Sequence, residues 1–142
     1  MNENAKLLQD VCNGCKYAST SINAALGYVK DEKMRRMMKK YSDEHENIKK
    51  KCDRLLKEEG EVEKRANPAA QMMMKLGVNM RLSMNDSKSH IAEVMINGCN
   101  MGMKAIAKKM NQRSGASGDS IDLASEIIAT ERSMMEDMLK YL

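Results

Sequence analysis

The sequence lacks the residues from which β-sheets are usually built. Among its 142 residues there is no Trp and no Phe, and there are four Tyr and one Pro, whereas Met occurs sixteen times. Aromatic and β-branched side chains favour strands, and Met, Lys, Glu, Leu and Ala favour helices. A chain of this length can bury about two thirds of its unfolded surface in one core. We therefore expect a single all-α domain that spans residues 1–142.

Long apolar runs and a strong excess of charge of one sign are also missing. No window approaches the ~18 consecutive apolar residues that span a bilayer, and the first ten residues, MNENAKLLQD, lack a basic segment followed by an apolar one. The 24 basic and 20 acidic residues are spread along the chain, so the net charge of +4 describes a solvated surface. We expect a cytoplasmic protein with no membrane span and no nucleic-acid partner, in which the cysteines are not disulfide-bonded.

Four long segments carry apolar residues at intervals of three and four, which is typical of amphipathic helices. They pair into a first hairpin at residues 4–59 and a second at residues 86–142, joined by a crossover at residues 60–85. Asp31 is the expected N-cap of the second helix, and Asp119 or Ser120 that of the last. Pro68 is expected to begin a short helix in the crossover, PAAQMMMKLGVNMRLSM.

The two hairpins repeat one another. NGCKYASTSI at residues 13–22 and NGCNMGMKAI at residues 97–106 share Asn-Gly-Cys and the final Ile, and a slightly larger offset in the second half aligns Glu44 with Glu131. Such a repeat predicts two helical hairpins packed face to face as a four-helix bundle. Four side chains then point inward in one layer: Cys15, Cys99, Glu44 and Glu131.

This order, spacing and symmetry resemble the ferritin and rubrerythrin superfamily. More closely, the chain resembles an uncharacterised bacterial family of ferritin-like four-helix bundles, a domain of unknown function, whose first and third helices carry Asp-Gly-Glu and Arg-Gly-Glu. The matching triplets here are Asn13-Gly14-Cys15 and Asn97-Gly98-Cys99. The resemblance implies a ferritin-like bundle with a short helix in the crossover.

The resemblance also implies which metal ligands have been lost. Di-iron relatives carry glutamate at the two positions that are Cys15 and Cys99 here. They also carry Glu-x-x-His on the second and fourth helices, where this chain has Glu44 to Asn47 and Glu131 to Met134. Four of the six expected ligands are therefore absent, and the usual di-iron chemistry is not expected.

Two interpretations of the layer remain. In one, two thiolates and two carboxylates bind zinc or iron through Cys15, Cys99, Glu44 and Glu131, with Cys12, His45 and Asn47 as helpers. In the other, which we favour, the cysteines act as small core residues and the glutamates lie at the edge of the stripe or share a proton. We therefore expect a non-catalytic binding or interaction protein rather than an enzyme.

The Met-rich helix expected at residues 68–84 lies outside the four-helix core. Its apolar surface needs a cover, which the end of the bundle, a second copy of the chain or a partner protein could provide. We expect a homodimer or a protein partner through this crossover helix.

Overall fold

The computed structural model describes residues 2–62, 64 and 66–142. This part of the chain contains five α-helices, a short 3-10 helix and no strand, which confirms the prediction of an all-α fold. Within it, no helix is long and apolar enough to cross a membrane. The helices are α1 (Glu3–Leu26), α2 (Glu32–Glu58), α3 (Pro68–Met84), α4 (Lys88–Gln112), α5 (Asp119–Met138) and η1 (Leu139–Tyr141).

The helix ends follow local chemistry, with one correction. Asp31 caps α2 as predicted, because its carboxylate accepts a hydrogen bond of 2.8 Å from the backbone N–H of Met34. Pro68 is the first residue of α3, a position at which a backbone N–H would have no hydrogen-bond partner within the helix, so the N–H that proline lacks is not needed there. Neither Asp119 nor Ser120 caps α5: the N-cap is Gly118, whose φ of 57° favours glycine.

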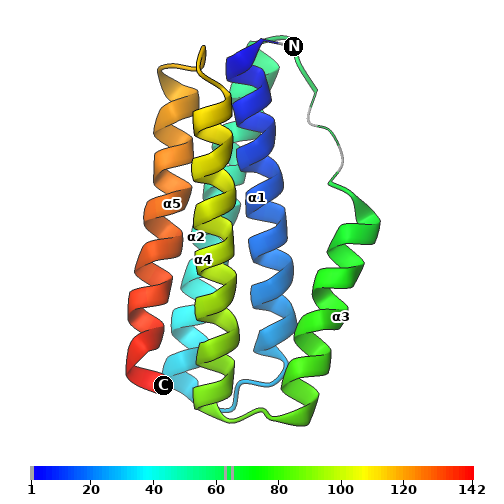
Figure 1. Cartoon of the computed structure of the whole chain (residues 1–142), viewed down its shortest axis with the longest axis vertical. Helices are drawn as coiled ribbons and strands as arrows, with labels where there is room; N and C mark the ends of the chain where they lie inside the picture. The colour runs from blue at the N-terminus through cyan, green and yellow to red at the C-terminus, as the bar shows by residue number, and fades with distance from the viewer. Residues whose placement is uncertain (1, 63, 65) are drawn as a thin grey trace.

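Four long helices pack side by side, and the fifth lies outside them (Figure 1). The helices α1 and α2 form one antiparallel hairpin, and α4 and α5 form a second one that packs against it. Because α2 and α4 run in the same direction, the chain between them has to return along the length of the bundle. That return segment contains α3, which packs chiefly against α1.

The buried apolar residues divide into two clusters along the bundle. The first joins the α1–α2 turn to α3 and the start of α4 and includes Tyr41, Cys99 and Met134. The second surrounds the start of α1 and the end of α2 and includes Cys15 and Ile48. The chain positions of these residues put the boundary between the clusters near the middle of α2 and α5.

One face of α3 is held firmly on the bundle. Its two buried residues, Val78 and Leu82, belong to the first cluster. The hydroxyl of Tyr28, in the turn after α1, donates a hydrogen bond of 3.1 Å to Oδ1 of Asn79. The crossover helix is therefore a packed element and not a loose connection.

We expect Leu82→Ala to lower the free energy of unfolding by about 2–5 kcal/mol, because the substitution leaves a cavity between α3 and the bundle. Urea denaturation at low protein concentration measures this loss. The matched control is Lys75→Ala on the same helix, an exposed site where the change should stay within about 0.5 kcal/mol. Equal small losses in the two variants would contradict the packing of α3 on the bundle.

Candidate functional site

His45 lies at the centre of the bundle, where it is the buried ion-pairing partner of Glu131. This side chain has no exposed surface and lies on α2 between Tyr41 and Ile48, which belong to different apolar clusters. Its Nε2 is 3.0 Å from Oε1 of Glu131 on α5, and its Nδ1 is 2.7 Å from the backbone carbonyl oxygen of Tyr41. An imidazolium carries a hydrogen on each nitrogen and so satisfies both acceptors.

The surroundings of His45 favour its protonated form. Burial of the ring disfavours the charge and lowers the pKa, but the hydrogen bond to Glu131, the charge of that carboxylate and the Tyr41 carbonyl outweigh burial. The charge of Glu44 adds to this effect. The pKa of His45 is therefore raised above its ordinary value, which favours a buried salt bridge with Glu131 between α2 and α5.

Glycine at position 102 makes room for this pair. A Cβ on Gly102 of α4 would lie 3.2 Å from Oε1 of Glu131, which is closer than side chains normally approach. The absence of a side chain at this position lets the Glu131 carboxylate pack against the backbone of α4. Gly102 therefore contributes to the position of the oxygen that His45 contacts.

The two repeated cysteines are held as neutral thiols. Burial is the main cause that raises the pKa of Cys15 and of Cys99, and the carboxylate of Glu131 raises both further. A thiolate is the form of cysteine that attacks electrophiles and binds metals. At neutral pH both side chains are therefore small buried core groups beside the His45–Glu131 pair.

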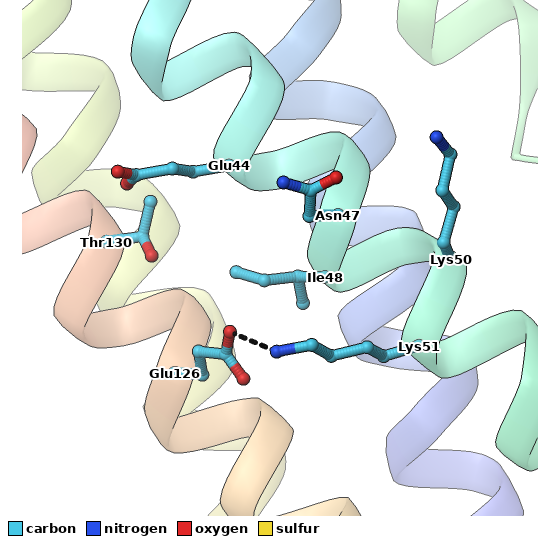
Figure 2. A pocket seen from close by; sticks show the side chains of 7 residues that line it. All are labelled: Glu44, Asn47, Ile48, Lys50, Lys51, Glu126 and Thr130. Atoms are coloured by element: carbon cyan, nitrogen blue, oxygen red, sulfur yellow. Dashed lines mark hydrogen bonds and ion pairs between the residues drawn. The ribbon is translucent and has the colours of Figure 1, made fainter.

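The structure corrects the expected inward position of Glu44. Its side chain is 38% exposed, and Oε1 lies 4.0 Å from Nζ of Lys40. It borders a shallow hollow of about 530 Å³ between α2 and α5 (Figure 2). The hollow is lined by Glu44, Asn47, Ile48, Lys50, Lys51, Glu126 and Thr130.

Glu44 lies at the edge of the bundle because the buried face of α2 is shifted by one residue from the predicted one. Between Tyr41 and Ile48, a step of three followed by four reaches Glu44, and a step of four followed by three reaches His45. Both are compatible with a helix of 3.6 residues per turn. The second is realised because His45 finds a carboxylate inside the bundle, whereas Glu44 is better solvated at its edge.

The other predicted helpers lie away from the pair. Cys12 is buried, and its Sγ is 3.4 Å from Oδ1 of Asp53. Asn47 is exposed and borders the surface hollow. In the part of the chain that the structure describes, no three His, Cys, Asp or Glu side chains converge closely enough to hold a metal ion.

The surface hollow offers little chemistry of its own. Figure 2 shows Lys51 reaching across it to Glu126, with 2.9 Å between Nζ and Oε1, while Lys50 points away. Lysine and glutamate therefore neutralise one another at this rim.

The sequence analysis named His45 only as a helper of a metal site and did not predict that it is the central buried residue. The sequence did contain a signal for this position, because His45 fits the helical spacing between Tyr41 and Ile48 as well as Glu44 does.

Comparison with protein-family models, with curated proteins and with solved structures found no match to this chain. The ferritin-like resemblance stays a prediction, and the function has to be argued from the residues themselves.

We expect His45→Leu and Glu131→Leu each to lower the free energy of unfolding by about 3–5 kcal/mol, because each leaves an unpaired group in the core. The double variant should lose less than the two losses added together, because neither charge is then left alone. Urea unfolding of the four proteins measures the coupling. Additive losses would show that the two side chains do not depend on one another.

The raised pKa of His45 gives a signed pH dependence. The contribution of the pair to stability is complete below the unfolded histidine pKa of about 6.5 and falls as pH rises through the folded pKa. The difference in unfolding free energy between the wild type and the His45→Leu, Glu131→Leu variant should therefore shrink above that pH. His90→Gln, which changes the only other histidine, should keep the wild-type profile. A constant difference across this range would contradict the assignment.

Proposed function

We propose that this protein is a non-catalytic interaction protein on a ferritin-like four-helix bundle, and that it binds its partner through the outer face of α3. The outer α3 face is the side of α3 turned away from the bundle. It consists of Ala69, Met72, Met73, Leu76, Met80, Ser83 and Met84, all of them exposed.

The observation that carries the proposal is that α3 is apolar on two opposite sides. On one side Val78 and Leu82 pack onto the bundle. On the other, Met73 is 73% exposed and Met84 is 85% exposed. Surface helices normally turn polar residues outward, and an extended exposed apolar stripe is typical of an interaction site.

Methionine suits such a surface. Its unbranched, polarizable side chain adapts to partners of different shape, and exposed methionines are common on binding surfaces. Complete burial of one such side chain is worth about 1.5–3 kcal/mol, so several together can support an association. The outer α3 face has four exposed methionines and one leucine, and none of its side chains is charged.

The central layer supports a structural role more than a catalytic one. Both nitrogens of His45 already have partners, and burial keeps Cys15 and Cys99 protonated. Binding of zinc or iron through Cys15, Cys99, Glu44 and Glu131 is the alternative function. It would require Glu44 to turn inward from the rim and His45 to give up its hydrogen bond.

The ferritin-like assignment has its own support. The long connection between α2 and α4 carries a helix, as the resemblance requires. The matching cysteines of the two hairpins, Cys15 and Cys99, are both buried in the core.

A photo-crosslinking residue introduced at Met73 or Met80 tests the interaction role in the cells that produce the protein. We expect an adduct of defined mass from both sites, which disappears when Leu76→Lys places a charge on the same face. The matched control carries the crosslinker at Arg132, an exposed position on α5, and should give no such adduct. Equal yields at all three sites, or none from α3, would contradict binding through the outer α3 face.

A further inference from the structure

We infer that the outer α3 face is a site of reversible methionine oxidation, at which a peroxide converts the exposed thioethers to sulfoxides and so weakens binding of the partner. The reacting class is a hydroperoxide, of which hydrogen peroxide is the smallest. The inference rests on the proposed function, because it names the regulation of the same surface.

Accessible methionine is concentrated on this one surface. The chain has sixteen methionines, and those that the described residues expose are Met72, Met73, Met80, Met84 and Met101. All except Met101 belong to the outer α3 face. The methionines that are at most 3% exposed are Met34, Met38, Met95, Met134 and Met138. An oxidant in the solvent therefore meets the thioethers of α3 before those of the core.

Cysteine is the other side chain that peroxides oxidise, and here it is shielded. All four cysteines are buried. Peroxides react with the thiolate form of cysteine, and burial raises the pKa of Cys15 and Cys99, so that both remain thiols. The exposed methionines are therefore the sulfur atoms of the described residues that a peroxide in solvent reaches first.

The reaction is a transfer of one oxygen atom. A lone pair on the thioether sulfur attacks one oxygen of hydrogen peroxide, an S–O bond forms as the O–O bond breaks, and water leaves after a proton transfer. The sulfur loses two electrons and the peroxide gains them. Reductases for the two sulfoxide epimers reverse the step with two thiols, which become a disulfide, and the sulfoxide oxygen leaves as water.

Oxidation changes the outer α3 face from apolar to polar. Met73, Leu76 and Met80 follow one another at intervals of three and four, so they line one side of the helix. A sulfoxide oxygen on this side accepts hydrogen bonds from water in the free protein. An apolar partner that covers the oxygen removes this water, and burial of an unsatisfied polar group is unfavourable. Oxidation therefore weakens partner binding.

The fold tolerates this change because the outer α3 face is not part of the core. Neither apolar cluster includes a residue of this face. The opposite side of α3 holds the helix on the bundle through Val78 and Leu82. Oxidation of the outer methionines should therefore alter the surface and leave the bundle folded.

Peptide mapping by mass spectrometry after brief exposure to limiting hydrogen peroxide tests the chemistry. Sulfoxide should form on the four methionines of the outer α3 face at least about tenfold faster than on the buried methionines. Protein oxidised at these positions should keep the wild-type midpoint in urea. Equal rates at exposed and buried methionines, or a bundle that unfolds as α3 is oxidised, would overturn the inference.

The effect on binding is measured with a photo-crosslinker at Ser83, which is exposed on the outer α3 face and leaves its methionines in place. The purified protein is irradiated in an extract of untreated cells, so that only its own side chains have met peroxide. We expect the adduct that forms in cells, with a yield about tenfold lower after oxidation. Both reductases, supplied with dithiothreitol, should restore the yield.

Leucine substitutions separate methionine oxidation from other effects of peroxide. The Met72→Leu, Met73→Leu, Met80→Leu, Met84→Leu variant keeps an apolar surface of similar size without an oxidisable sulfur, so its adduct should resist peroxide. The matched control, Met101→Leu, removes the exposed methionine of α4 and should stay as sensitive as the wild type. Restoration by the reductases decides the question if the four-leucine variant itself binds poorly.

An adduct that survives oxidation of all four methionines would overturn the inference and leave the interaction role standing. Loss of the adduct from the four-leucine variant after peroxide would also overturn it, because the cause would then lie outside these sulfur atoms. Absence of the adduct before any oxidation would remove the proposed function and its regulation together, even where mass spectrometry finds the sulfoxides.

Discussion

Two ionisable groups buried in the centre of a helical bundle cost several kcal/mol each in lost hydration unless they satisfy one another. His45 and Glu131 do so, and the requirement fixes much around them. It sets the rotation of α2 that turns His45 inward and Glu44 outward, and it gives Gly102 its role beside the carboxylate. Burial raises the pKa of the Cys15 and Cys99 thiols, and the negative charge of Glu131 raises both further.

Most of the fold was predictable from the sequence because its signals are local. Spacings of three and four located the helices, and Asp31 and Pro68 marked two of their starts. The central layer was less predictable because Glu44 and His45 fit the same spacing equally well. Which of the two is buried depends on the carboxylate of Glu131, far away in the chain, and no local sequence pattern predicts such a contact. The N-cap of α5 was predicted wrongly for a different reason, since Gly118, with its positive φ, stands where a side-chain cap was expected.

The repeat in the sequence survives only in part in three dimensions. Cys15 and Cys99 are both buried, as matching positions should be, but Glu131 is buried where Glu44 is at the rim. The resulting layer is asymmetric, with its polar link running from α2 to α5. Because a polar pair between α2 and α5 closes the middle of the bundle, the binding surface that we propose lies elsewhere, on the outer α3 face.

The account therefore depends on whether the central layer is closed by its own side chains or completed by a metal. Elemental analysis of protein purified without oxygen, chelator or affinity tag decides between the two most directly. The account predicts zinc and iron well below one equivalent per chain. About one equivalent of either metal, lost in the Cys15→Ser, Cys99→Ser variant together with stability, would contradict it and make the layer a thiolate-carboxylate metal site.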